Sequence, residues 1–295
     1  MRMAMACSIF AAATLTPALS QASDVKVETS HLIVSDDTGS LSDDHLRRLA
    51  GHAQETLNKI LAFWSAGYRT ERFGKIRIIF DAPRGDLYSS VFYFDRRDGQ
   101  TIRAVRVSGV KGSPQMMAHK LTSAVFPHKD KLTRNIMGTV AEAQVGNPLT
   151  FPGCGFSSDV WVLAFAGTQS LIPLDKLGPD NESWGMKDAG GGRMVPFDRA
   201  RHFRTYAEAA SFGNYLFQAY GIDKIKQYYR LSIQQERPWR QVFGIGLQEL
   251  EATWLKSLKA GTDAREENVS TAATLFAKDP ATACLEAQRI VSERR

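Results

Sequence analysis

The chain has few cysteines, no strong charge bias and no long apolar run beyond its first residues. Only three of its 295 residues are cysteine, and the net charge of +6 is spread over basic and acidic residues that alternate along the chain. No segment after residue 22 approaches the ~20 apolar residues that a membrane-spanning helix needs. No basic block indicates a nucleic-acid partner, and no internal repeat or low-complexity tract is present.

The N-terminus has the pattern of a secretory signal. Arg2 is the only charged residue before Asp24, an apolar stretch runs from Met3 to Leu19, and Ser20-Gln21-Ala22 has the small-x-small pattern of a cleavage site. We predict that residues 1–22 are a signal peptide, which makes the protein periplasmic or secreted with no membrane span after cleavage. The alternative is an N-terminal anchor, for which the apolar stretch is short.

Two cysteines, Cys154 and Cys284, remain once the signal is removed. An even number of cysteines in an oxidising compartment favours a disulfide bond. We predict that this bond ties the C-terminal segment to the middle of the chain. The alternative is a pair of buried free thiols.

The first part of the chain, residues 23–110, alternates between strand and helix patterns. Ser42 precedes Asp43 and Asp44 and is a suitable helix cap. The expected elements are a strand over 26–34, a helix from 43 to 64, a strand over 75–80 and a hairpin of strands 90–94 and 101–108. This β-α-β-β-β order predicts an N-terminal mixed-sheet subdomain in an α+β fold.

The remainder has helical periodicity. The expected helices cover 113–126, 134–145, 206–220, 222–231, 238–243 and 247–258, with an apolar segment over 159–166 and a long loop over 176–203. Residues 260–270 have the composition of a polar linker, and a last helix is expected from Asp279-Pro280. We therefore expect a helical subdomain over 111–260 and a C-terminal helical tail over 261–295.

Several motifs resemble those of one enzyme family. His119-Lys120-Leu121-Thr122-Ser123 resembles the HELTH form of an HExxH helix, and Asn135–Ala141 lies where a W-L-x-E-G-L-A segment would follow. Further similarities are Ser170–Leu174, Tyr206–Phe212 and Gly246–Trp254. Over roughly residues 26–258 the chain resembles the gluzincin-type zinc metallopeptidases with a peptidase MA-like domain. The resemblance implies a zincin-like fold in which a helical subdomain closes a cleft.

The metal site is the least faithful part of this resemblance. In the family, two histidines one helical turn apart and a glutamate from a later helix bind zinc, and the glutamate between the histidines is the general base. Here His119 matches the first ligand, but Lys120 replaces the base, Ser123 the second histidine and Gly138 the third ligand. A lone imidazole beside an ammonium does not hold zinc, so we expect no cofactor and a vestigial site.

Other arrangements of the same residues are conceivable. Glu142 lies one turn after Gly138, so a Lys120–Glu142 contact could link the two helices in place of the metal. Glu142 and Tyr206 are also candidate cleft residues. A metal site rebuilt from His119, His128 and Glu142 lacks any motif spacing. A Ser123–His119 pair lacks an oxyanion hole in mid-helix, and His119 as a structural histidine is the simplest interpretation.

These observations predict an exported, catalytically inactive peptidase-like protein, a pseudopeptidase, that binds a peptide or protein partner in its cleft. The alternative is an active periplasmic metal-dependent peptidase or hydrolase with a rebuilt site, which would require zinc. A third interpretation is a structural protein in which side chains fill the cleft.

Overall fold

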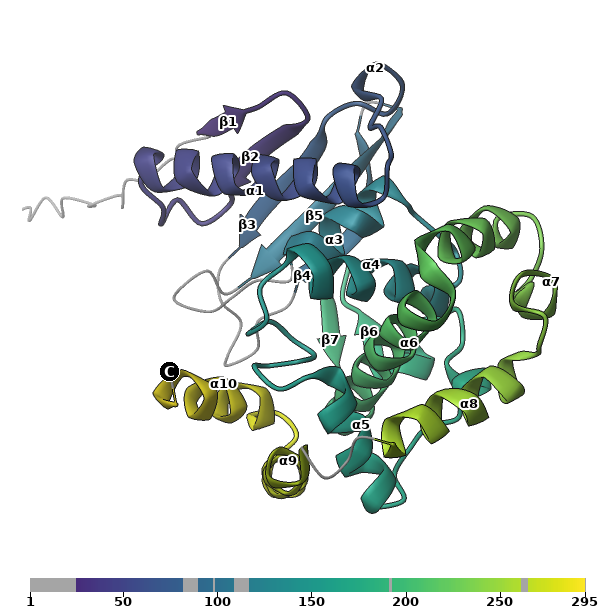
Figure 1. The fold of residues 1–295 in the computed structure, drawn as a ribbon. Helices are drawn as coiled ribbons and strands as arrows, with labels where there is room; N and C mark the ends of the chain where they lie inside the picture. Colours follow the sequence, from purple (N-terminus) through teal and green to yellow (C-terminus); the bar gives the residue numbers. More distant parts are fainter. Residues whose placement is uncertain are drawn as a thin grey trace, which may run out of the picture.

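The computed structural model describes residues 25–81, 90–97, 99–108, 117–190, 193–260 and 265–294. A mixed five-stranded sheet forms the N-terminal part, and a largely helical region follows (Figure 1). The predicted α+β class is therefore confirmed. The predicted signal peptide lies outside the described residues.

The sheet has the strand order β1-β2-β3-β5-β4. Its strands are β1 (Lys26–Glu28), β2 (Leu32–Asp36), β3 (Ile76–Asp81), β4 (Ser90–Arg97) and β5 (Gln100–Ser108). The β2–β3 and β3–β5 pairs are parallel, and the two edge pairs are antiparallel. The predicted hairpin of β4 and β5 is confirmed. The single strand predicted over 26–34 is wrong, because the chain turns where the Thr29 N–H donates to the Leu32 carbonyl at 3.0 Å.

Helix α1 (Asp43–Phe63) covers the sheet. It begins as predicted, since the Ser42 hydroxyl accepts the His45 N–H at 3.3 Å. It packs against β1, β2 and the two buried helices that follow the sheet, and its buried face shares one core with alternate residues of β2, β3 and β5. The short helix α2 (Thr70–Phe73), which has no periodicity to reveal it, leads into β3.

Two buried helices follow the sheet. Helix α3 (Met117–Val125) is buried on all sides from Met117 to Ala124 and packs against α1, β4, β5 and α4. The predicted start of this helix at 113 lies outside the described residues. Helix α4 (Lys131–Val145) starts three residues earlier than predicted, because the Asp130 carboxylate accepts the Thr133 N–H at 3.1 Å and caps it.

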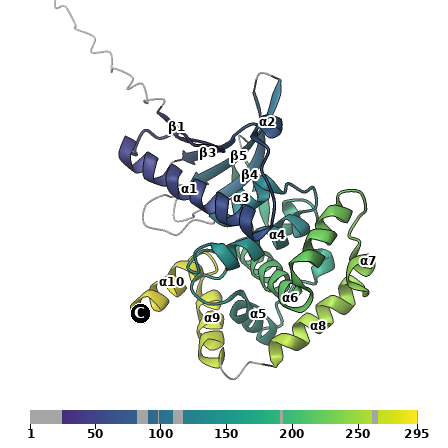
Figure 2. The same ribbon diagram turned by 45° about the horizontal axis from the view of Figure 1, so that its top comes forward.

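The C-terminal region lies on the far side of α3 and α4 from the sheet, as Figure 2 shows. Its elements are α5 (Ser158–Gly167), η1 (Leu174–Lys176), η2 (Glu182–Trp184), β6 (Met186–Asp188), β7 (Met194–Pro196), α6 (Arg199–Ser232), α7 (Trp239–Phe243), α8 (Leu247–Lys259), α9 (Glu266–Lys278) and α10 (Ala283–Glu293). Gly221, with φ of +79°, divides α6 into the two predicted helical halves.

Two predictions about this region are wrong. The segment 176–203 is not a plain loop, since β6 and β7 form an antiparallel pair within it and α6 begins before it ends. The linker predicted over 260–270 is cut short by α9, so the tail holds two helices instead of one. Among the described residues, no helix is both long and apolar enough to cross a membrane.

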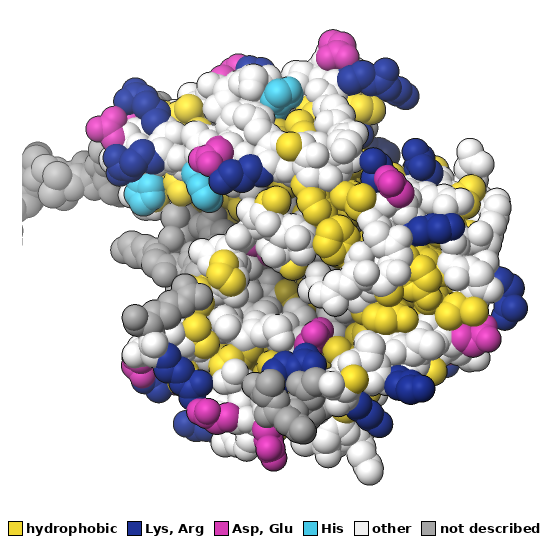
Figure 3. All heavy atoms as spheres, viewed as in Figure 1, with side chains coloured by type: hydrophobic (Ala, Val, Ile, Leu, Met, Phe, Trp, Pro, Cys, Tyr) yellow, Lys and Arg dark blue, Asp and Glu magenta, His cyan; other side chains and the backbone are white. Residues whose placement is uncertain are grey.

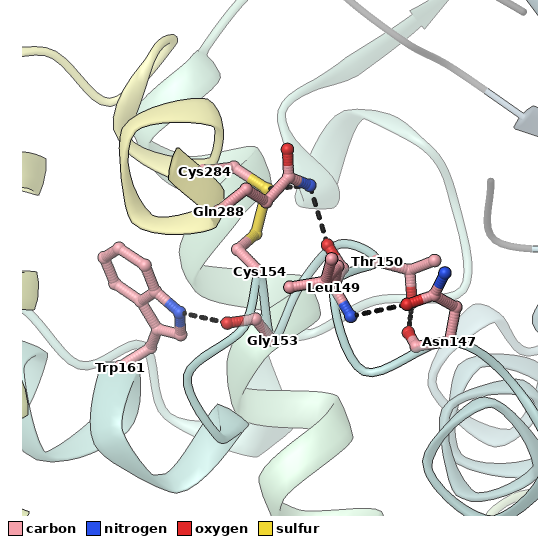
Figure 4. The surroundings of a disulfide bond; sticks show 8 residues. All are labelled: Asn147, Leu149, Thr150, Gly153, Cys154, Trp161, Cys284 and Gln288. Atoms are coloured by element: carbon pink, nitrogen blue, oxygen red, sulfur yellow. Dashed lines mark hydrogen bonds between the residues drawn. A yellow bond between two sulfur atoms is a disulfide. The ribbon is translucent and has the colours of Figure 1, made fainter. Parts of the chain in front are cut away.

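The predicted disulfide bond between Cys154 and Cys284 is confirmed, with the two Cα atoms 5.2 Å apart (Figure 4). It joins α10 to the loop before α5. In the same place the Gln288 amide donates to the Leu149 carbonyl at 2.7 Å, and the Trp161 indole donates to the Gly153 carbonyl at 2.9 Å. The disulfide and the Gln288 bond fix the tail on the loop that follows α4, and the Trp161 bond fixes this loop on α5.

Candidate functional site

The residues predicted for the vestigial site come together where α3, α4 and α6 meet. Helix α3 supplies His119, Lys120 and Ser123, and α4 packs along it and supplies Gly138 and Glu142. Tyr206 of α6 lies with its ring centroid 6.0 Å from that of His119. All these residues are buried.

The missing side chain of Gly138 determines where the His119 ring lies. A Cβ atom at Gly138 would come within 2.2 Å of His119 Cδ2 and 2.7 Å of Nε2, closer than real contacts allow. The imidazole therefore lies directly against the α4 backbone. It fills the space through which a side chain at position 138 would have to pass.

His119 is held as a neutral ring. It is 1% exposed, and its Nδ1 has no hydrogen-bond partner among the described residues. Burial lowers its pKa well below the ordinary value, and the positive charges of Lys120 and Arg134 lower it further. A neutral imidazole with a free nitrogen can accept a hydrogen bond or bind a metal, so the neighbouring groups decide its chemistry.

Glu142 is engaged by the backbone. Its Oε2 accepts the His119 N–H at 2.8 Å, and its Oε1 accepts the Asn147 N–H at 3.2 Å and the Thr150 hydroxyl at 3.0 Å. The Glu142 side chain thus bonds the backbone of α3 directly and links this helix to α4 and to the loop that follows it. Burial raises the pKa of this carboxyl to about 7 in spite of these hydrogen bonds.

The direct Lys120–Glu142 contact does not form. Within the described part of the chain, no carboxylate lies close enough to the Lys120 ammonium for an ion pair, that is, within 4.0 Å. The ammonium lowers the pKa of the Glu142 carboxyl only by attraction over a longer distance. The ammonium instead lies 5.4 Å from the centroid of the Tyr206 ring. The two helices are linked by Glu142 and the His119 backbone.

The other rearranged sites do not form either. The Ser123 hydroxyl donates to the His119 carbonyl at 3.1 Å, a bond within the helix, so it is not paired with the imidazole. His128 Nδ1 accepts the Asp130 N–H at 3.0 Å in the turn before α4. In the described ranges, no three side chains of His, Cys, Asp or Glu converge in a way that could hold a metal ion. The residues predicted for the vestigial site therefore do not fit zinc.

Sequence reasoning missed three basic residues beside this site. Lys131 and Arg134 of α4 and His202 of α6 surround Tyr206 together with Lys120. The sequence did hold a signal for Lys131, because Lys131, Asn135, Gly138 and Glu142 follow the 4-3-4 spacing of one helix face. Starting the helix at 134 left Lys131 outside it.

No protein-family model, no curated protein and no solved structure matches this chain.

Proposed function

We propose that the protein is an exported pseudopeptidase: a zincin-like fold that binds a peptide or protein partner and has no peptidase chemistry. The observation that carries the proposal is the position of the His119 ring over Gly138, where a third zinc ligand would need space. The other two functional positions are Lys120 and Ser123, and neither offers a metal ligand of the kind zinc prefers.

Export is part of the same proposal. The signal-like first 22 residues and the Cys154–Cys284 disulfide both support a periplasmic or secreted protein. The loop after α4, which is held by the disulfide and contacts the junction through Glu142 and Tyr206, would give a partner a rigid surface.

Two other functions compete with this one. An active hydrolase would need a metal or nucleophile that the junction of α3, α4 and α6 does not supply. A purely structural protein is favoured by one observation, namely that Lys120 and Tyr206 are themselves buried and fill space at the junction. A buried ammonium without a carboxylate partner is unfavourable for stability, however, which favours a binding role over a purely structural one.

Metal analysis of the purified protein tests the proposal. We expect substoichiometric zinc after purification without chelators, the same zinc content in His119→Ala, and no cleavage of a mixed peptide library followed by mass spectrometry. The matched control is His52→Ala, which removes an exposed histidine of α1. Stoichiometric zinc that is lost in His119→Ala but retained in His52→Ala would establish the active hydrolase instead.

A further inference from the structure

Two lysines converge on the ring of Tyr206, and an arginine lies near them. Lys120 of α3 is 6% exposed and Lys131 of α4 is 3% exposed. Their ammonium nitrogens lie 5.4 Å and 5.8 Å from the centroid of this ring. Arg134, one turn along α4 from Lys131, lowers the pKa of both lysines by repulsion. We call Lys120, Lys131 and Arg134 the cation cluster.

No acidic side chain balances the cation cluster at contact distance. The Lys131 ammonium donates to the Asn181 side-chain carbonyl at 2.9 Å, and Arg134 donates to the His128 carbonyl at 3.1 Å. Lys120 has neither a hydrogen-bond acceptor nor an ion-pair partner within the described residues. Two buried lysines and the half-buried Arg134 thus have only neutral groups at contact distance within the described residues, while the carboxylates of Glu142, Asp180 and Asp130 act on them from farther away.

The same junction holds two further unsatisfied groups. The Nδ1 atoms of His119 and His202 are buried without a hydrogen-bond partner in the described structure. Their rings lie 6.0 Å and 4.8 Å from that of Tyr206. Buried polar atoms are nearly always satisfied, so a cluster of unsatisfied atoms is typical of a place that a ligand or ordered water completes.

Physical chemistry gives a reason to expect a negatively charged ligand here. A buried cation is unfavourable unless an anion pairs with it, and apolar side chains of similar size would fill the same space without that penalty. Burial lowers the pKa of Lys120 to about 7 and that of Lys131 to about 6, so near neutral pH each side chain is partly a neutral amine that can take up a proton when a negative charge arrives. Such perturbed groups concentrate at functional sites.

We propose that the cation cluster binds a doubly charged oxyanion, such as the phosphate group of a phosphorylated ligand. Lys120 and Lys131 would contact the oxyanion from two helices, while Arg134 adds the third positive charge. The rings of Tyr206 and Trp184 lie beside the lysines and would face the uncharged part of the ligand. The inference deepens the proposed binding function and rests on it, because it names the chemical group that the partner presents.

The site is distinct from the charged surface of the protein. On the face seen in Figure 3, basic and acidic side chains are scattered and form no single-sign patch. Weak binding of anions to exposed basic side chains would therefore be unaffected by replacing Lys120 or Lys131. A matched control is Lys176, an exposed lysine of η1.

Titration with inorganic phosphate tests the proposal directly. Calorimetry and the melting temperature would be measured at constant ionic strength, with chloride as the reference anion. We expect saturable binding and a rise in melting temperature, an affinity at least about tenfold lower in Lys120→Met and in Lys131→Met, and no change in Lys176→Met. Both buried variants should still fold, since methionine replaces a buried cation that has no ion-pair partner by an apolar chain of similar length.

The pH dependence provides a second readout. Sulfate, whose charge is constant between pH 6 and 8.5, replaces phosphate in this arm. Its affinity should fall by about tenfold or more over that range, because the two lysines must be protonated to bind it. The charged and titratable groups that face them are His119 from α3, Arg134 and Glu142 from α4, His202 and Tyr206 from α6, and Asp180 from the segment before η2.

Three outcomes would overturn the inference: no saturable binding beyond that of chloride, equal affinity in Lys120→Met, or an affinity that does not change with pH. The zinc measurement separates this failure from that of the proposed function. If the protein contains no zinc and binds no oxyanion, the inference about the cation cluster is wrong and the pseudopeptidase proposal still stands. Stoichiometric zinc bound through His119 overturns the pseudopeptidase, whatever the anion does.

Discussion

Gly138 shows how one position without a side chain arranges the neighbouring helix. Because a Cβ atom there would lie 2.2 Å from His119 Cδ2, Gly138→Ala must displace either the imidazole or the α4 backbone. We expect a loss of about 1–3 kcal/mol in the free energy of unfolding, as for other overpacked cores. Urea denaturation of the variant measures it.

Gly51 provides the matched control for this substitution. It lies in the interior of α1, is exposed, and has nothing within 4 Å of the Cβ position. Gly51→Ala should therefore stabilise the protein by about 0.5–1 kcal/mol through helix propensity. If Gly138→Ala stabilises the protein as Gly51→Ala does, the His119 ring does not depend on the space at Gly138.

Helix α6 holds the segment before η1 through a buried carboxyl group. Both Glu208 oxygens accept the Ile172 N–H, at 3.1 Å and 3.3 Å, and the side chain is 1% exposed. Burial raises the pKa of Glu208 to about 8, above the 4.5 of an unperturbed glutamate. Between these two values the folded state binds more protons than the unfolded state, so this group makes stability fall as the pH rises.

Glu208→Gln removes that titration and keeps an oxygen acceptor for Ile172. Between about pH 5 and 8, its free energy of unfolding should gain on that of the wild type by up to about 1.4 kcal/mol per pH unit. Urea denaturation at several pH values measures the difference, and Glu236→Gln, at an exposed position before α7, controls for the loss of one negative charge. Parallel curves for wild type and Glu208→Gln would contradict the prediction.

The helices also show which boundaries can be predicted from the sequence and which cannot. Helix α1 was predictable because Ser42, two acidic residues and a regular apolar face all indicate the same boundaries. The start of α4 was not, because Asp130 caps it before any apolar periodicity begins. Because of that three-residue difference, Lys131 was not placed on the helix and the cation cluster was not predicted. The cluster also depends on how three helices pack, since Lys120, Lys131 and Tyr206 each come from a different helix, and no local sequence pattern indicates this packing.

The whole molecule depends on how the C-terminal tail is attached. Alanines 272, 283 and 287 of α9 and α10 are buried in a second core with Trp161, Phe165 and Phe203 from α5 and α6. Phe276 packs on Phe165 with ring centroids 4.7 Å apart. The tail therefore completes a core that α5 and α6 cannot bury alone, and we expect it to unfold together with them.

The disulfide reinforces this attachment by restricting the unfolded chain. It joins residues 130 positions apart, and closing so long a loop removes much of the conformational entropy of the unfolded state. We expect the Cys154→Ala/Cys284→Ala variant to lose about 3–5 kcal/mol in its free energy of unfolding. Urea denaturation with and without reductant measures the loss, and reductant should leave the double variant unchanged. Because the tail shares a core with α5 and α6, the variant should still unfold in one transition. A separate early transition confined to the tail would mean that the covalent bond alone holds α9 and α10 in place.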